Sequence, residues 1–405
     1  MRVFAFGSNG SGQLGIGHTE DVSIPTECLF TSPTPNDKVV NIVAGGNHTL
    51  ILTDSGAVYA AGCNTDGRCG PGIQALQEEN GTKNGQAEEN ILRFRRIFLS
   101  DTSTLKTIDT FKCVSATWEG SILVPSTQDK VFVLGSTAKG ELGLGKDITT
   151  PILDPGVSIP NFPPRGTTVA SLASGMGHTV AILSNGEVYG WGGSRKGQLG
   201  DTLKAEKIVW EPAKVDGIPF SATGAVCGRE FTVVLGQRSQ GEFVVLGDEG
   251  NRWGIAKIPH SLRSTSGDAA RSGYLDIGSS WHGIYVHAAS KSENGLYSQS
   301  TPGSEPAAFP GHLIAWGRND RGQLPPPNLP SLIKMGVGSE HVLALLEDGS
   351  VATFGWGEHG NCGPDTDSRG NVAGAYNFVS LPDDGGGGKV VDVAAGCATS
   401  WLVVE

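Results

Sequence analysis

The stretch "VYGWGGSRKGQLG", residues 188–200, decides the fold because the chain repeats it. Related stretches occupy residues 3–15, 58–70, 131–143, 243–254, 313–325 and 351–363. Each copy has four residues of strand character followed by a fixed glycine, and most copies close with Gly-x-Leu-Gly or Gly-x-Cys-Gly. The fixed glycines are Gly7, Gly62, Gly135, Gly192, Gly247, Gly317 and Gly355. A motif that recurs along a whole chain indicates a structural repeat.

A second element alternates with the first. It occupies residues 39–56, 111–129, 168–186, 222–241, 274–290, 332–349 and 390–405. Each copy reads as a strand, a turn of small residues, a second strand and a tight turn. Short strands separated by turn signals at this spacing indicate an all-β closed architecture. The chain has 60 glycines in 405 residues, about twice the usual share, which fits many tight turns.

Together the two elements predict a seven-bladed β-propeller that forms a single domain over residues 1–405. A lone sheet of this kind leaves two raw edges and a bare apolar face, whereas a ring buries those faces against its neighbours. The longer repeats have room for four strands. Because the chain begins in the third strand of a repeat and ends in the second, we expect the last blade to combine two N-terminal with two C-terminal strands. Glycines are expected where strands bend or where adjacent blades approach closely.

One local motif invites a different interpretation. Gly10, Gly12 and Gly15 spell Gly-x-Gly-x-x-Gly, the phosphate-binding turn of dinucleotide folds. The copies do not reproduce Gly10, however, and no helix follows the motif, so we reject a nucleotide site. The run "DDGGGGK" at 383–389 likewise lacks the helix and hydroxyl residue of a phosphate loop. No Gly-x-Ser-x-Gly or His-Glu-x-x-His motif is present, and we expect a protein without enzymatic activity, cofactor or metal.

The composition narrows the classes of partner. The formal net charge is −11, from 30 basic and 41 acidic residues, and no basic tail or stripe predicts direct nucleic-acid binding. The cysteines are odd in number and form no Cys-x-x-Cys, so neither a disulfide framework nor a zinc site is expected. Free thiols suit a reducing compartment. No signal peptide or long apolar run is visible, so no membrane association is expected. The cysteines are Cys28, Cys63, Cys69, Cys113, Cys227, Cys362 and Cys397.

The repeats resemble those of the regulator-of-chromosome-condensation family. The stretch "GMGHTVAILSNGEVYGWGGSRKGQLG" at 175–200 follows the family pattern almost residue for residue, and 45–70 is nearly as close. The resemblance covers the whole chain and implies a seven-bladed β-propeller. It does not specify one function, because propellers of this family have several.

Two groups within the family fit poorly. The exchange factor for the GTPase Ran has a basic N-terminal tail and a wedge inserted in its third blade. Here Met1 is two residues from the first strand, and 135–151 reads as an ordinary repeat. The plant ultraviolet sensor needs repeated Gly-Trp-Arg-His-Thr motifs, which are absent. The chain is more similar to the fungal alpha-tubulin suppressor, or killer-toxin-insensitivity, group.

That resemblance implies a partner and a pathway. The propeller of this group pairs, as a heterodimer, with a small zinc-binding, electron-carrying protein. Together they serve diphthamide synthesis on elongation factor 2 and Elongator-dependent modification of wobble uridines in tRNA. The implied location is the cytoplasm, with the nucleus as a second compartment.

A histidine recurs near the turn of the second element, at His48, His178, His282 and His341. These four residues fall on different blades, too far apart to share one metal ion with bonds of about 2 Å. We interpret them as structural side chains that bridge turn backbones. The other repeats place Glu119, Phe231 and Thr399 there.

The tryptophans divide into two groups. Trp191 and Trp316 precede the fixed glycine, where every copy is apolar, and we expect them in the core. Trp118 and Trp281 fall in the turn, just before the recurrent histidine, at a slot that elsewhere holds Asn47, Gly177, Glu230, Glu340 and Ala398. We expect that slot to face solvent and to gather near the axis, although each tryptophan could instead fold back over its own blade. Aromatic and arginine anchors with a polar surround indicate an interface. The predicted partner-binding residues are Trp118, Trp281, Met176, Arg229, Glu230 and Glu340.

Two insertions interrupt the repeats, at about 74–90 and 291–311. The first is polar and acidic, and the second is rich in Ser, Pro and Gly, so both are expected to be solvated surface loops.

The sequence therefore predicts a rigid, non-catalytic disk that binds another protein on one face. The alternative is a regulator of nucleotide exchange on a small GTPase, which would use acidic and aromatic residues of the same face. A chromatin scaffold is disfavoured by the negative charge and by the missing basic tail.

Overall fold

The computed structural model describes residues 2–31, 37–71, 89–101, 104, 106–136, 138–148, 150–247, 250, 252–262, 273–289, 311–382 and 388–405. Throughout these ranges the regular structure is β, apart from short 3₁₀ turns, as the sequence predicts. The 3₁₀ turns are η2 (Lys204–Glu206), η3 (Arg238–Gln240) and η4 (His260–Leu262). No described helix is long and apolar enough to cross a membrane.

The strands form antiparallel units that run outward from a central axis. Three units of four strands, from inner to outer, are β3 (Val39–Ala44), β4 (His48–Thr53), β5 (Val58–Cys63) and β6 (Asn90–Arg96); β9 (Phe111–Ala116), β10 (Gly120–Pro125), β11 (Phe132–Gly135) and β12 (Ile152–Ser158); and β13 (Val169–Ser174), β14 (His178–Leu183), β15 (Val188–Gly193) and β16 (Ile208–Lys214). A small hairpin, β7 (Leu99–Asp101) and β8 (Lys106–Ile108), lies beside β12.

The remaining units vary in size. Two have three strands among the described residues: β17 (Gly224–Cys227), β18 (Phe231–Leu235) and β19 (Phe243–Gly247), and then β20 (Tyr274–Ser280), β21 (Gly283–Ala289) and β22 (Gly311–Gly317). The next is β23 (Leu332–Val337), β24 (His341–Leu346), β25 (Val351–Trp356) and β26 (Asn371–Val379), joined to β22 through the pair Gly311–Leu332.

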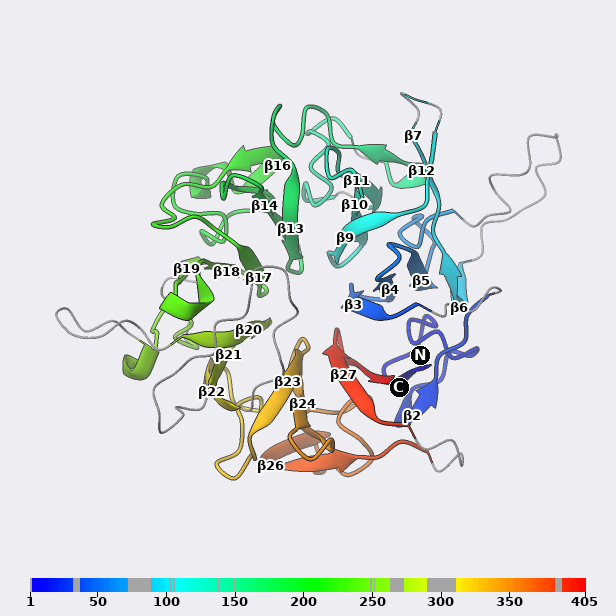
Figure 1. Ribbon diagram of the computed structural model, residues 1–405, viewed down its shortest axis with the longest axis vertical. Coiled ribbons are helices and arrows are strands. Elements are labelled where there is room, and N and C mark those ends of the chain that lie inside the picture. The colour runs from blue at the N-terminus through cyan, green and yellow to red at the C-terminus, as the bar shows by residue number, and fades with distance from the viewer. Residues whose placement is uncertain are drawn as a thin grey trace.

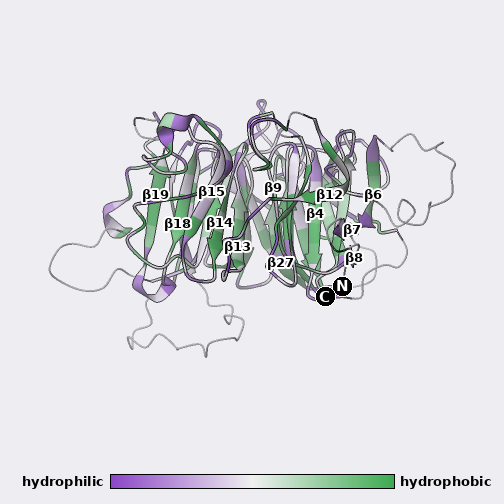
Figure 2. Ribbon diagram, turned by 90° about the horizontal axis from the view of Figure 1, so that it is seen from above, coloured by the Kyte–Doolittle hydropathy of each residue, from purple (hydrophilic) through white to green (hydrophobic). Residues whose placement is uncertain are grey.

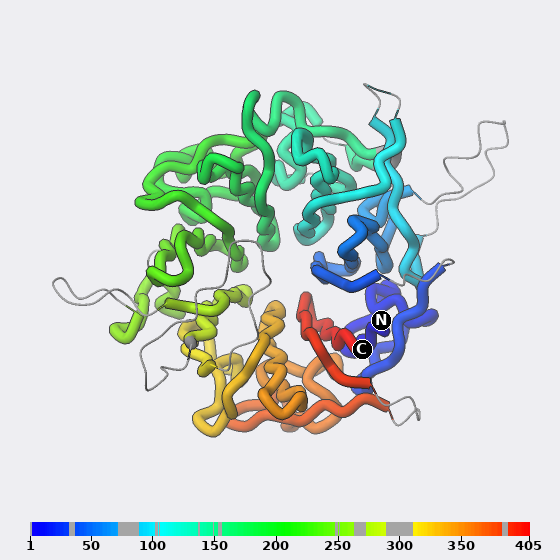
Figure 3. Tube along the Cα trace, in the orientation of Figure 1, coloured from blue at the N-terminus to red at the C-terminus, as the bar shows by residue number. Residues whose placement is uncertain are grey.

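The inner strands form a closed ring (Figure 1). Around the axis, β3 contacts β9, then follow β13, β17, β20, β23 and β27 (Val390–Ala395), which contacts β3 again. Seen from the side, the strands run between the two faces of a disk (Figure 2). The chain travels round the axis once (Figure 3). The structure is thus a β-propeller, and the predicted fold class is confirmed.

The last unit closes the ring with strands from both ends of the chain. Its order is β2 (Val22–Glu27), β1 (Arg2–Gly7), β28 (Thr399–Val404) and β27. The pairing of β1 with β28 runs from Arg2 opposite Val404 to Gly7 opposite Thr399. The two ends therefore lie side by side (Figure 1), in the arrangement that the sequence predicts.

The hydrophobic core lies between blades. Each apolar cluster combines residues from two neighbouring units; one, for example, joins Val233 of β18 to Ile284 and Val286 of β21. Second strands such as β4 and β14 are buried along their whole length. Trp191 is fully buried as predicted, and its indole Nε1–H donates to the carbonyl of Glu141 at 2.9 Å. A blade alone would expose both of its apolar faces, so the ring is the unit of stability.

The fixed glycines form a bend in every third strand. All seven have positive φ, from +85° at Gly247 to +123° at Gly317. A Cβ on Gly62 would lie 2.3 Å from the carbonyl oxygen of Asn47, so no other residue fits there without displacement of the backbone. The sequence predicts the bend, but the close backbone is the turn of the same blade rather than an adjacent blade.

Both predicted insertions fall almost wholly outside the described residues. Asn90, near the end of the first, begins β6, and Gly311, at the end of the second, begins β22. The assignment of 1–405 to one domain, with these two surface loops, stays a prediction.

Candidate protein-binding face

One face of the disk carries the turns between first and second strands and the loops that follow third strands. We call it the tryptophan face, after Trp118, Trp281, Trp253 and Trp356. The residue after each fixed glycine donates its backbone N–H to the turn of the same blade, as in Arg318 N to His282 O at 2.8 Å. Turns and loops are thereby fixed to one another at this face.

The strand register corrects the sequence alignment of these turns by one residue. His48 is the Cα partner of Gly62, and the residues equivalent to His48 are Gly120 and Gly283, not Glu119 and His282. Because two turns have glycine at the histidine position, the neighbouring Glu119 and His282 were misassigned to it. One turn position therefore holds Gly46, Trp118, Met176, Arg229, Trp281, Ser339 and Cys397, and the next holds Asn47, Glu119, Gly177, Glu230, His282, Glu340 and Ala398.

Backbone hydrogen bonds connect the first of these positions from blade to blade. Gly46 N–H donates to Trp118 O at 2.9 Å, and Trp118 N–H donates to Met176 O at 3.0 Å. On the other side of the axis, Arg229 donates to Trp281 O at 3.1 Å, and Trp281 donates to Ser339 O at 2.9 Å. The turns that carry the predicted anchors are therefore rigidly held near the axis.

Trp118 and Trp281 meet across the axis. Their ring centroids are 5.9 Å apart and the rings are tilted by 47°, within the range of favourable aromatic pairs. Both side chains are half-buried, so neither folds back over its own blade and neither is fully exposed. The two residues also line the mouth of a cavity of about 360 Å³ between the inner strands. The sequence predicts their gathering at the axis, and the structure adds their mutual contact.

Arg229 is the third residue of this axial group. It is exposed, and its guanidinium Cζ lies 5.7 Å from the centroid of the Trp281 ring. This distance is typical of a cation–π contact. Met176 is half-buried and joins the group through its backbone carbonyl and the cavity wall. Glu230 is half-buried and forms no ion pair with any described residue.

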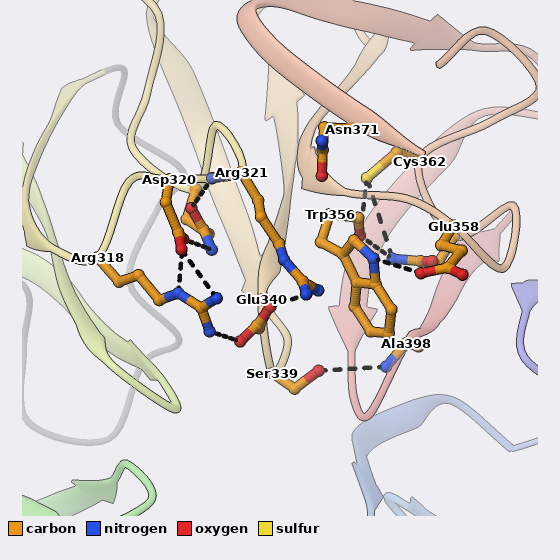
Figure 4. A network of polar contacts seen from close by, with 12 residues as sticks. Arg318, Asp320, Arg321, Ser339, Glu340, Trp356, Glu358, Cys362, Asn371 and Ala398 are labelled. Atoms are coloured by element: carbon orange, nitrogen blue, oxygen red, sulfur yellow. Dashed lines mark hydrogen bonds and ion pairs between the residues drawn. The ribbon is translucent and has the colours of Figure 1, made fainter. Parts of the chain in front are cut away.

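Glu340 does not lie on the surface as the sequence predicts. Its side chain is only 6% exposed and forms ion pairs with Arg318 and, at 3.2 Å, with Arg321 (Figure 4). Arg318 also binds Asp320 at 2.6 Å. The slot appears tolerant of polar residues in the sequence because a loop two strands away covers it in this blade. Glu340 is therefore a structural residue of the face rather than an exposed anchor.

Sequence reasoning missed an arginine–aromatic row in the loops after the third strands. Arg252 lies 4.3 Å and Arg318 lies 5.3 Å from the centroid of the Trp253 ring. Arg321 lies 5.0 Å from that of Trp356. The signal was present, because the fourth residue after the fixed glycine is basic in several copies: Lys139, Lys196, Arg321 and His359.

The recurrent histidines act between blades. Nε2 of His48 lies 2.9 Å from Ser121 Oγ, which donates its own proton to Arg68 O at 2.7 Å. The hydroxyl must therefore accept from Nε2–H, which fixes the tautomer. The same arrangement joins His178 to Thr232 and His341 to Ser400, each at 2.9 Å. Their predicted structural role holds, with the next blade as the partner.

The described residues show no constellation for metal binding or catalysis. No group of three or more His, Cys, Asp or Glu side chains is placed to hold a metal ion there. The cysteines are free thiols. Burial raises the pKa of both Cys113 and Cys227 to about 12, which disfavours the reactive thiolate. What this face offers is recognition through rings and guanidinium groups.

Comparison with known proteins supports this class of structure. Models of the regulator of chromosome condensation (RCC1) repeat match residues 2–52 and 185–235, and, for a second model, 39–68 and 169–198. An RCC1 repeat-containing protein of Schizosaccharomyces pombe is 28% identical over 404 residues, covering 100% of this chain and 99% of the relative. The fold and its repeats define an RCC1-type β-propeller. The chain belongs to the RCC1 repeat family.

Further relatives show the range of the family. The secretion-regulating guanine nucleotide exchange factor of Mus musculus is 25% identical over 408 residues, covering 91% of this chain and 76% of the relative. Among known structures, Prp20p of Saccharomyces cerevisiae, described with its binding properties to Gsp1p and histones, superposes with a TM-score of 0.70 at 17% identity over 100% of this chain and 91% of its own. Human WBSCR16 gives 0.69 at 18% identity, over 100% and 98%. At this identity the structures support the fold alone.

Proposed function

We propose that this protein is a non-catalytic binding propeller that captures a partner protein on the tryptophan face. The Trp118–Trp281 pair supports the proposal most directly. Two large aromatic rings are kept half-exposed at the axis, on turns held by hydrogen bonds between blades, with the Arg229 guanidinium over one ring. Tryptophan and arginine are the residues most enriched among binding hot spots.

Rigidity strengthens this interpretation. A side chain that is already ordered loses little conformational entropy on binding, so more of its contact energy contributes to affinity. The cavity beneath the pair also provides no cluster of titratable groups that would suggest a reaction. A protein surface that offers preorganised anchors and no reactive group is suited to recognition.

For the partner, we propose the small zinc-binding, electron-carrying protein of the diphthamide pathway. The support is the resemblance to the compact fungal group and the alignment with the fungal relative over nearly the full length of both chains. The propeller would then serve diphthamide synthesis on elongation factor 2 and Elongator-dependent tRNA modification, in the cytoplasm and also in the nucleus.

A second candidate function is regulation of nucleotide exchange on a small GTPase. It is favoured by the relative named as a guanine nucleotide exchange factor. In this case the same face would press on the nucleotide site of the GTPase. Release of a labelled guanine nucleotide from a panel of small GTPases separates the two candidates, since a passive binding partner leaves the release rate unchanged.

The double variant Trp118→Ala/Trp281→Ala tests the binding face. Loss of both rings should abolish capture of the partner from cells of the source organism, measured by affinity purification and mass spectrometry. Because the rings pack on each other, we expect a fall in folding stability of only about 1–2 kcal/mol, seen as a small shift in the denaturant midpoint.

Phe378→Ala provides the matched control. Phe378 is an aromatic residue of the outer strand β26 with 59% of its surface exposed, far from the axis in Figure 1. The control should retain the partner. Full capture by the double tryptophan variant would refute the proposed face.

A further inference from the structure

Three arginines of the tryptophan face converge on one imidazole. We call Arg229, Arg252 and Arg318, with Trp253 and His282, the arginine cluster. The Trp253 ring lies 6.5 Å from the His282 ring, and the guanidinium groups of Arg252 and Arg318 both lie over Trp253. Arg229 reaches the cluster from the turn of the preceding blade, where its N–H bonds to Trp281 O.

The cluster has an excess of positive charge on an acidic protein. Arg318 is neutralised by Asp320 and Glu340. Arg229 and Arg252 are exposed and form no ion pair with a described residue. The pKa of His282 is lowered to about 4 by burial and then by Arg229, Arg318 and Arg252. The imidazole is therefore neutral at pH 7 and adds no charge, and the two arginines have capacity for an external anion.

We infer that the arginine cluster binds carboxylates of an acidic segment in the partner protein. A guanidinium group matches a carboxylate with two parallel hydrogen bonds. The neighbouring Trp253 and Trp281 rings hold the guanidinium groups by stacking and give the peptide backbone an apolar surface. This inference rests on the proposed binding function and specifies the chemistry that the partner presents.

Charge favours a peptide over a nucleic acid as the ligand. Nucleic-acid binding depends on several phosphate contacts made by a basic surface, whereas the whole chain carries a net charge of −11. Asp320 and Glu340 border the cluster and would repel a continuous phosphate backbone. Two available guanidinium groups beside aromatic rings are sufficient for a short run of Asp or Glu.

The test is a titration of the full chain with a short fluorescein-labelled peptide rich in glutamate, followed by fluorescence anisotropy. The same peptide with glutamine in place of glutamate is the first control. The variant Arg229→Gln/Arg252→Gln should weaken binding by about tenfold or more. Arg195→Gln/Lys196→Gln removes the same charge from exposed residues of another blade on this face and should retain most of the affinity.

Each outcome has a defined meaning. Binding of the glutamate peptide that falls with salt and is lost in Arg229→Gln/Arg252→Gln supports the inference. Failure of the wild-type chain to bind it, equal binding of the glutamine peptide, equal loss in the two double variants, or tighter binding of single-stranded RNA overturns it. If Arg229→Gln/Arg252→Gln still captures the cellular partner while Trp118→Ala/Trp281→Ala does not, the binding function stands and the acidic segment is rejected.

Discussion

At the scale of single residues, one bond explains the Gly-x-x-His-Thr pattern. His178 donates Nε2–H to Thr232 of the next blade, and Thr232 donates in turn to Gln198 O at 2.8 Å. The glycine three residues before the histidine leaves room for the ring, because a Cβ on Gly175 would lie 2.7 Å from His178 Cε1. Each residue of the pattern thus has a physical task, and the tasks join neighbouring blades.

These buried bonds make stability depend on pH. Burial lowers the pKa of His48 to about 3 and of His178 and His341 to about 4, whereas the unfolded chain titrates near 6.5. Below that pH the unfolded state binds more protons. The stability is therefore complete above about pH 6.5 and falls as the pH drops toward 4, by at most ~1.4 kcal/mol per pH unit for each histidine.

His178→Gln tests this origin of the pH dependence. The amide can still donate to Thr232 but does not titrate, so the fall in unfolding free energy between about pH 6.5 and pH 4.5 should become shallower by up to ~1.4 kcal/mol per unit. Urea unfolding at a series of pH values measures the slope. The exposed His260, replaced by Gln, is the control. An unchanged slope in His178→Gln would show that other groups carry the effect.

At the scale of elements, the third strand and its glycine bend define each blade. The strand pairs with the outer strand through a register shift at the glycine, for example between Ala60 and Gly62. This shift turns the chain away from the outer strand and into the loop that forms the tryptophan face. The bend therefore connects the core of the blade to its binding surface.

Gly62→Ala should be far more damaging than Gly10→Ala. Gly62 has φ of +112° and the carbonyl of Asn47 in the place of a Cβ, so we expect a loss of about 2 kcal/mol or more. Gly10 has open space around it and no positive φ, and its substitution should stay within about 0.5 kcal/mol. Denaturant midpoints compare the two. Equal effects would contradict the assigned role of the bend.

The elements also show how far the sequence predicts this protein. The strand pattern, the glycine bends and the core Trp191 follow from local periodicity and are visible in the chain. The turn register is not, because Gly120 and Gly283 replace the histidine that marks it. The burial of Glu340 depends on Arg318 and Arg321, which arrive from a different loop. Long side chains from distant segments decide such a site, and periodicity does not encode them.

At the scale of the whole molecule, the pairing of β1 with β28 closes a ring of about the full chain length. The blades bury their faces only against one another, so this pair completes the core on both of its sides. Bringing two ends together across so long a loop costs more conformational entropy than forming a local hairpin, since the cost rises with the logarithm of loop length. Closure is thus the step at which the folded ring opposes the largest chain entropy.

Covalent joining of the two ends should therefore stabilise the protein. Arg2 and Val404 are direct partners across β1 and β28, so a short Gly-Ser linker can span the gap without strain. Backbone cyclisation removes the closure entropy from the unfolded state, and we expect a gain of about 3–5 kcal/mol in the free energy of unfolding. A linear chain that carries the same linker residues is the control, compared by the midpoint of denaturant unfolding. A cyclised protein no more stable than that control would show that the ring does not depend on the contact between its ends.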